Sequence, residues 1–287
     1  MLLLAVTCAC SHGDVPARPP APSPRDAAAT VVVHADAAPA DASGYADLGA
    51  ALTAIIPADA RVIGFGELHN RTDRAQVTST LTHFTNEALP VLKDRLSDLI
   101  IETWITDPHC GSAAQVATKT VTTTMKRPAA TRSEIGLLAD AAKAAKIQPH
   151  AMRITCDDYA KIAPPGKDMD VAAMLDLTTR ELGRIATEAV LHRDKEPDHR
   201  PLIALYGGAL HNDRFPAKGV EQWSYAAKVD ELTHDHYVEI DIIVPELAEG
   251  DAQMQKQPWY PLVEKAGKTV QVYTRGERSF VVILPRS

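Results

Sequence analysis

The sequence lacks, or has little of, three features that would point to a common functional class. No run of apolar residues reaches the ~18 that a membrane-spanning helix needs. Lysine and arginine form no cluster, and the formal net charge is −7, so the sequence offers no basic face for nucleic acid. Aromatic residues make up only 5% of the chain, which leaves few large rings to line an apolar ligand slot. With 45% hydrophobic and 23% charged residues, the composition is that of an ordinary soluble globular protein.

Cysteine is also scarce, with four residues in 287. Cys8 and Cys10 lie in the N-terminal segment, which leaves Cys110 and Cys156 for the rest of the chain. In an exported protein such a pair favours a disulfide, and we predict a Cys110–Cys156 bond. Buried free thiols or thiolate metal ligands are the alternatives.

The N-terminus is typical of a targeting segment. Residues 1–10 form a short apolar run that ends in Ala9-Cys10, which is similar to a bacterial lipoprotein signal although it lacks a basic start. Cys10 is the expected lipidation site, and Cys8 is the alternative. A wrongly assigned start codon or a disordered tail would also explain this segment. The lipoprotein interpretation predicts a chain held at the membrane of the bacterial cell envelope, periplasmic or outer, by its N-terminal lipid.

The next segment differs sharply from the rest of the chain in composition. Residues 11–44 are rich in Pro, Ala and Asp and contain almost nothing that could build a core, so we predict a disordered tether. From residue 45 onward the pattern becomes globular. We therefore expect a single domain over residues 45–287.

Apolar runs and helical periodicities alternate along this domain. Buried strands are predicted near residues 62–66, 98–103, 150–155 and 202–207, and helical patterns at 48–55, 72–96, 131–142 and 169–191 separate them. We expect a further strand at 236–244, and strands at 270–273 and 280–284 to form a terminal hairpin. This order predicts an α/β fold with a mainly parallel central sheet flanked by helices, antiparallel edge strands and a C-terminal hairpin.

Two of the predicted strands end in the same short pattern. Gly66-Glu67-Leu68-His69 closes one strand, and Gly208-Ala209-Leu210-His211 closes another far along the chain. Open α/β sheets place their sites at the carboxyl ends of the strands. We therefore predict that Glu67, His69 and His211 share one site, the alternative being two unrelated structural histidines.

Other polar residues follow predicted strands and are expected on the same rim. Glu102 closes the second strand, Asp157 follows the third, and Asn212 follows His211. Two imidazoles with carboxylates suit a divalent metal that keeps one position open for water, so we predict His69, His211, Glu67 and Glu102 as metal ligands and catalytic residues. Without a metal, His69 would serve as general base with a carboxylate as its orienting partner. Asp157 and Asn212 are expected to line the rim.

The paired Gly-x-x-His motifs resemble the superfamily that groups erythromycin esterases, ChaN-like haem-uptake proteins and the TraB/Tiki membrane-tethered proteases. The resemblance covers roughly residues 45–287. Erythromycin esterases usually have Gly-Glu-x-x-His, whereas here His69 stands one position earlier, as in ChaN and Tiki proteins. The resemblance to Tiki-type proteases implies a divalent metal held by His69 and His211.

Two functions follow from these observations. The first is a metal-dependent hydrolase that acts on a peptide or ester bond in a small-molecule or peptide substrate. The second is a ChaN-like uptake lipoprotein that binds haem or another ligand without catalysis, with His69 or His211 as axial ligand. The sequence makes no prediction about oligomeric state.

We expect several other polar residues to have structural roles. His83 is expected to pack on or lie at the surface of a helix, and His234 and His236 to flank a turn before a strand. Glu239 and Asp241 alternate along that strand, and we expect them on its solvated face.

Overall fold

The computed structural model describes residues 42–105, 107–164, 166–196 and 199–287. The predicted signal, lipidation site and most of the tether lie outside this part, and Ser43 and Gly44, assigned to the tether, belong to the first strand. The described strands are β1 (Ser43–Tyr45), β2 (Val62–Glu67), β3 (Leu96–Ile105), β4 (Gln148–Arg153), β5 (Leu202–Gly208), β6 (Tyr237–Ile243), β7 (Val270–Gly276) and β8 (Ser279–Ile283).

These strands form one mixed sheet, in the order β1-β7-β8-β6-β2-β5-β3-β4. The six strands from β8 to β4 run parallel, whereas β7 pairs antiparallel with both β8 and β1. The predicted α/β fold with antiparallel edge strands and a terminal hairpin is therefore confirmed. At the centre, β2 lies between β5 and β6, so the two strands that carry Gly-x-x-His motifs are direct neighbours.

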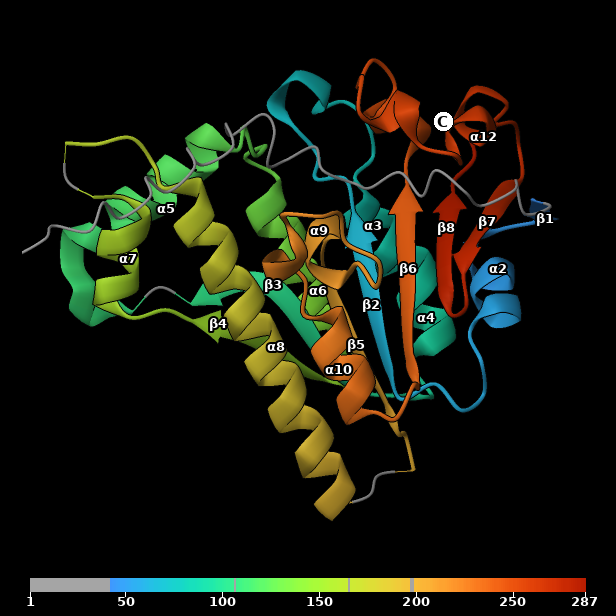
Figure 1. The fold of residues 1–287 in the computed structure, drawn as a ribbon, viewed down its shortest axis with the longest axis horizontal. Helices are drawn as coiled ribbons and strands as arrows, with labels where there is room; N and C mark the ends of the chain where they lie inside the picture. The colour runs from blue at the N-terminus through green and yellow to red at the C-terminus, as the bar shows by residue number, and fades with distance from the viewer. Residues whose placement is uncertain (1–41, 106, 165, 197–198) are drawn as a thin grey trace, which may run out of the picture.

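Helices cover both faces of this sheet (Figure 1). The longer ones are α2 (Leu48–Ile55), α5 (Gly111–Thr124), α6 (Thr131–Ala144), α7 (Cys156–Ile162), α8 (Val171–Lys195) and α10 (Ala226–Leu232). The short ones are α3 (Thr80–His83), α4 (Leu89–Leu92), α9 (Ala209–Asn212), α11 (Pro245–Ala248) and α12 (Tyr260–Glu264), with 3₁₀ turns at Thr72–Arg74, Pro108–Cys110, Glu221–Trp223 and Met254–Lys256. None of the helices in the described ranges is both long and apolar enough to cross a bilayer.

The two faces of the sheet have separate cores. One core packs β2 side chains such as Phe65 against α2, α4 and α6, and the other packs Val62 against α8 and α10. Adjacent residues of a strand point to opposite faces, so β2 supplies both cores, and all six of its residues are buried. This packing fixes β2, and with it the position of Glu67 at its carboxyl end.

Two local predictions about helices need correction or refinement. The sequence Thr131-x-x-Glu134 is typical of a capping box, but Thr131 is the first helical residue and Ala130 occupies the N-cap without a side-chain bond. The helical pattern at 72–96 begins with a 3₁₀ turn and continues as unbroken helical backbone from α3 through a π-helical turn (Phe84–Ala88) into α4. Pro90 follows this π-helical turn, in which the Leu89 N–H bonds the Phe84 carbonyl five residues earlier.

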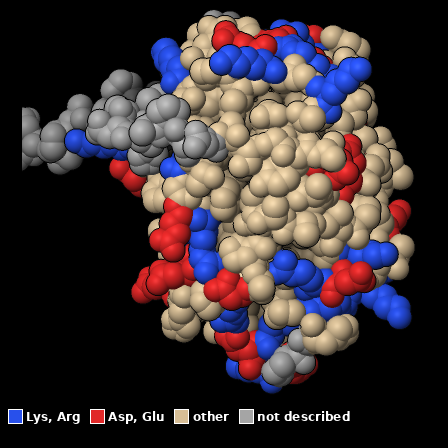
Figure 2. Space-filling model, turned by 90° about the vertical axis from the view of Figure 1, so that its right-hand side faces the viewer, with Lys and Arg blue, Asp and Glu red and all other residues tan. Residues whose placement is uncertain are grey.

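The surface at the β1 edge of the sheet has little charge at its centre. Figure 2 shows this face, with basic and acidic residues around its margins. The site described next lies at a different place, at the carboxyl ends of the central strands.

Candidate functional site

Three adjacent strands bring the predicted residues together. Glu67 is the last residue of β2, His211 lies in α9 directly after β5, and Glu102 lies near the end of β3 on the other side of β5. The strands are parallel, so their carboxyl ends lie side by side at the same end of the sheet. His69 follows Glu67 by two residues and reaches over β5, where its Nε2 atom lies against Gly208.

The position of Glu102 depends on an irregularity of β3. The register of β3 against β4 shifts between Ile101 and Trp104, and its pairing with β5 stops at Ile101. Such a bulge re-aims the side chains within it. The Glu102 carboxylate consequently turns over β5, where its Oε2 accepts the Gly208 N–H at 2.5 Å.

Two glycines make room for these side chains at the end of β5. A Cβ atom on Gly207 would lie 2.5 Å from Glu102 Oε2, and one on Gly208 would lie 2.8 Å from His69 Nε2. The glycines that end β5 therefore leave the space into which the two functional side chains fold.

His69 lies between two carboxylates. Its Nδ1 is 2.5 Å from Glu67 Oε1, and its Nε2 is 3.6 Å from Glu102 Oε1. The first distance is a hydrogen bond that fixes the ring, whereas the second is too long for one. When His69 is neutral with its proton on Nδ1, an unprotonated nitrogen faces a carboxylate oxygen, and only a proton or another cation between them makes this arrangement favourable.

These contacts shift the pKa values of His69 and Glu102. Burial and the charge of Arg127 act to lower the pKa of His69, but the carboxylates of Glu102 and Glu67 outweigh them and raise it above its ordinary value. Burial acts to raise the pKa of Glu102, yet His69, His211 and Arg127 hold it well below its usual range. Glu102 is therefore ionised at neutral pH.

The Nδ1 atom of His211 is held by two neighbouring groups, which leaves Nε2 for the site. Its Nδ1 is 3.0 Å from the Trp223 carbonyl and 2.8 Å from Thr179 Oγ1. The carbonyl can only accept, so Nδ1 carries the proton and Nε2 keeps its lone pair. Burial lowers the pKa of His211 despite the charge of Glu102, so its imidazole is neutral at neutral pH.

Sequence reasoning missed two further members of this site. Arg127, which follows α5, places Nη1 at 3.7 Å from Glu67 Oε1 and Nη2 at 3.9 Å from Glu102 Oε1. The Tyr206 hydroxyl donates to Glu67 Oε2, and burial together with the charge of Glu67 raises the pKa of Tyr206 so that it stays protonated. A tyrosine inside an apolar strand, directly before Gly-Gly, was the available signal for Tyr206, but nothing in the sequence marked Arg127.

Among the described residues, no polar contact joins Asp157 or Asn212 to Glu67, His69 or Glu102. Asp157 is exposed in the first turn of α7. The buried Asn212 amide donates back along β2 to the Gly64 carbonyl and to Asp241 Oδ1, both at 3.1 Å. Asn212 therefore fixes α9 against β2 and supports the position of His211 from below.

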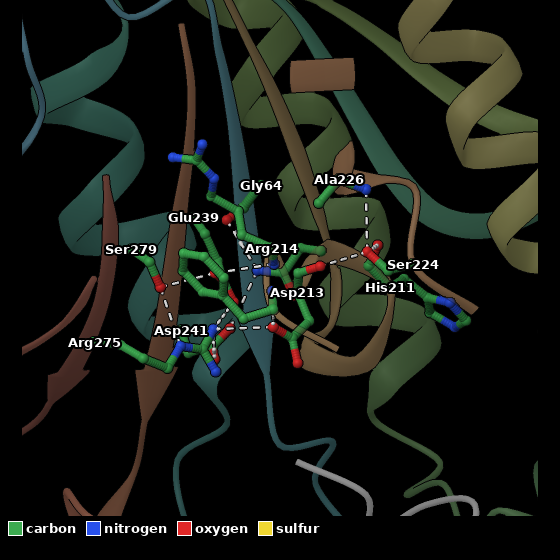
Figure 3. Close-up of polar contacts among 12 residues, drawn as sticks. Gly64, His211, Asp213, Arg214, Ser224, Ala226, Glu239, Asp241, Arg275 and Ser279 are labelled. Carbon is green, nitrogen blue, oxygen red and sulfur yellow. Dashed lines mark hydrogen bonds and ion pairs between the residues drawn. The ribbon is translucent and has the colours of Figure 1, made fainter. Parts of the chain in front are cut away.

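Through its bond to Asp241, Asn212 contacts a buried ionic cluster. Figure 3 shows the members of this cluster, Asp213, Glu239, Asp241 and Arg275. The Arg275 guanidinium contacts Glu239 and lies 3.6 Å from carboxylate oxygens of both Asp213 and Asp241. The expectation that Glu239 and Asp241 lie on a solvated face is wrong, because β6 has parallel neighbours on both sides and both of its faces are covered. Burial and the charge of Asp213 raise the pKa of Asp241.

The predicted disulfide is present in the structure. It joins Cys110, at the N-cap of α5, to Cys156, the first residue of α7, with a Cα–Cα distance of 5.2 Å. Together with Asp107, these cysteines form a group whose ligand atoms lie within 4.8 Å of one another, but the disulfide occupies both sulfurs. Within the described ranges, no three of the predicted ligands Glu67, His69, Glu102 and His211 are gathered that closely.

Comparison with known proteins gives little further information. No family model matches the chain, and no curated protein matches it. Among solved structures the chain is similar to that of the type III effector HopBA1, with a TM-score of 0.43 and 10% sequence identity over 86% of this chain and 98% of that one. This likeness assigns no function, and the resemblance to the esterase, ChaN and Tiki superfamily stays a prediction.

Proposed function

We propose that this protein is a hydrolase whose site is formed by His69, Glu102 and His211 around a divalent metal ion, and that it cleaves a peptide or ester bond. The observation that carries the proposal is the 3.6 Å separation of His69 Nε2 and Glu102 Oε1. Two ligands held at ~2.0–2.1 Å in tetrahedral geometry lie roughly 3.3 Å apart. The His69–Glu102 pair thus has nearly the spacing that one bound cation requires.

The charge at the site supports the same proposal. Glu67 and Glu102 bring two negative charges and Arg127 brings one positive charge, so a neutral His69 leaves one negative charge uncompensated among these groups. A divalent cation would offset that charge. The third donor, His211 Nε2, has its lone pair available because Nδ1 is bonded to Trp223 and Thr179. The donors must converge further than they do here to complete the set.

Each of the remaining residues has a definite role under this proposal. Glu67 accepts from His69 Nδ1 and fixes the tautomer in which Nε2 can act as ligand, the arrangement common behind metal-bound histidines. Tyr206 in turn holds Glu67. Arg127 lies beside both carboxylates and is partly exposed, so it can bind the carbonyl oxygen or carboxylate of a substrate. The metal would supply an activated water and polarise the bond to be cleaved.

The test is hydrolysis of ester and peptide reporter substrates by the purified chain. Activity should disappear after chelation, return on addition of Zn²⁺ or Mn²⁺, and fall by a factor of about 10² or more in Glu102→Gln. Asp107→Asn, which removes a partly exposed carboxylate that bonds His109 beside the disulfide, should leave activity unchanged. Activity that survives both chelation and Glu102→Gln contradicts the proposal.

Haem binding is the second proposal, and the same preparation tests it. A titration with haem followed by its absorption spectrum would give a shift that is lost in His69→Ala or His211→Ala if either residue is an axial ligand. We also propose a lipid anchor at Cys10, which would hold the protein at the cell envelope for either function.

A further inference from the structure

A cavity of different chemistry lies at the amino ends of the parallel strands, whereas the histidine site lies at their carboxyl ends. It has a volume of about 340 Å³ and lies where β3 and β4 begin and where α6 and α8 end. Four of the residues that line it are cationic and none of its described lining residues is acidic; the lining comprises Ser97, Lys143, Lys146, Ile147, Gln148, Pro149, Arg193 and Arg200. From these features we propose a binding site for a phosphate-bearing ligand.

The first arginine of the cavity is held by a buried carboxylate. Arg193 Nε donates to Asp98 Oδ2 at 2.7 Å, and Asp98 is almost fully buried. His150 and Ser97 also bond to Asp98, at 2.8 and 2.6 Å. Burial acts to raise the pKa of Asp98, but these bonds hold it well below its usual range, so the carboxylate remains charged and keeps the guanidinium in place. A fixed guanidinium loses less conformational freedom when it binds a ligand.

The second arginine donates to two backbone carbonyls. Arg200 donates from Nη2 to the Lys146 carbonyl at 2.8 Å and from Nη1 to the Ala145 carbonyl at 3.3 Å. These carbonyls close the C-terminus of α6, which ends in a Schellman motif with Ile147 N–H bonded to the Ala142 carbonyl. Both arginines of the cavity are therefore positioned by the protein before any ligand arrives.

The two lysines provide the mobile part of the site. Lys146 has φ +59° and occupies the left-handed position of the Schellman motif, where glycine or asparagine is usual. Lys143 lies one turn earlier on α6, exposed, with its Nζ 3.8 Å from Asp140. Ammonium groups on flexible stems beside fixed guanidinium groups suit a compact anion that carries more than one charge.

Size and charge together define the ligand class. A cavity of this volume falls at the small end of ligand sites, which suits a phosphate monoester, a diphosphate or a phospholipid headgroup rather than an extended polyanion. The chain as a whole carries a net charge of −7, so it does not attract anions in general. Binding must then come from this local group of cations.

The experiment is calorimetric titration of the full chain with inorganic pyrophosphate at low ionic strength. Lys146→Asn removes one charge and places a residue that tolerates the left-handed conformation, so the fold should be kept. It should weaken binding roughly fivefold. Lys126→Asn is the matched control, because Lys126 has φ +52° at the end of α5 but does not line the cavity, and it should leave binding unchanged.

A second arm identifies the source of the phosphate. Vesicles of phosphatidylcholine with and without phosphatidylglycerol are sedimented with the wild-type chain and both variants. Binding that needs the anionic lipid and falls in Lys146→Asn alone supports the proposal and identifies a headgroup, whereas the same dependence on pyrophosphate identifies a soluble phosphate. If neither arm shows binding that depends on Lys146, or if Lys126→Asn weakens it equally, the proposal is overturned.

Discussion

The two histidines of the candidate site differ because their partners differ. His69 lies between two carboxylates, which raise its pKa, whereas His211 is buried against a carbonyl and a hydroxyl, and burial lowers its pKa. One imidazole therefore favours a positive charge at its Nε2, and the other offers a lone pair. A cation bound between these two histidines would replace the positive charge at His69 and accept the lone pair of His211.

The shift at His69 makes stability depend on pH when no metal is bound. Its folded pKa lies above the ordinary value of 6.5, so its contribution is fully present below pH 6.5 and is lost as the pH rises through the folded value. In chelator, the free energy of unfolding of wild type should therefore exceed that of His69→Gln most at pH 6 and least at pH 9. His211 is present in both proteins, and burial, the main cause of its lowered pKa, acts on it in both.

The measurement is denaturant unfolding at a series of pH values, with His83→Gln as control. His83 also bonds a carboxylate through Nδ1, at 2.6 Å from Glu87 Oε1, but this pair lies outside the site. A wild-type advantage over His69→Gln that stays constant from pH 6 to pH 9 would contradict the charged arrangement at His69.

The variant Gly207→Ala tests how closely the Glu102 side chain packs on β5. In Gly207→Ala the new methyl group would lie 2.5 Å from Glu102 Oε2 and must push the carboxylate away. We expect a loss of ~1–3 kcal/mol in the free energy of unfolding, together with weaker metal binding. Gly136→Ala is the matched control: it lies on the exposed side of α6 with nothing near its Cβ position, so it should stabilise the helix by up to ~1 kcal/mol. A Gly207→Ala protein as stable as wild type would show that Glu102 has room to move.

At the residue scale, the sequence was sufficient to predict that Glu67, His69, Glu102 and His211 lie near one another, because each stands at or after an apolar run. Arg127 could not be predicted, since its place depends on how the loop after α5 folds back over the sheet. The interpretation of Glu239 and Asp241 failed for a related reason. Alternating polar residues indicate a solvated face only at a sheet covered on one side, and this strand is covered on both.

At the scale of elements, strands were easier to predict than their irregularities. The apolar runs identified β2, β3, β5 and β6, but no pattern showed the shift of register in β3 that turns Glu102 over β5. The segment that forms α5 was not assigned either, because its many threonines suit a helix and a strand almost equally. That helix depends on tertiary contacts, among them its disulfide.

The disulfide should provide much of the stability of the α5–α7 region. Cys110 and Cys156 are 46 positions apart, and closing a loop of this length should stabilise the fold by about 4 kcal/mol in the chain-entropy description. Dithiothreitol should therefore shift the urea unfolding midpoint of wild type to lower concentration and leave that of Cys110→Ser/Cys156→Ser unchanged. Equal midpoints for oxidised and reduced wild type would show that packing alone holds α5 and α7 together.

At the scale of the whole molecule, the two ends of the parallel strands have different chemistry. The carboxyl ends carry imidazoles and carboxylates, and the amino ends of β3 and β4 border a cavity lined by lysine and arginine. The class of fold follows from the alternation of strands and helices along the chain. The order of strands does not, since the pairing of β2 with β5 depends on which apolar faces pack together in three dimensions.

The central claim is that His69, Glu102 and His211 hold one divalent metal ion. Its most direct test is the metal content of the purified chain by elemental analysis after dialysis against limiting Zn²⁺. Wild type and His83→Ala should each retain about one equivalent, whereas His69→Ala and His211→Ala should retain almost none while their circular dichroism spectra remain unchanged. If wild type retains no metal, or if folded His69→Ala and His211→Ala retain as much as wild type, the claim is contradicted.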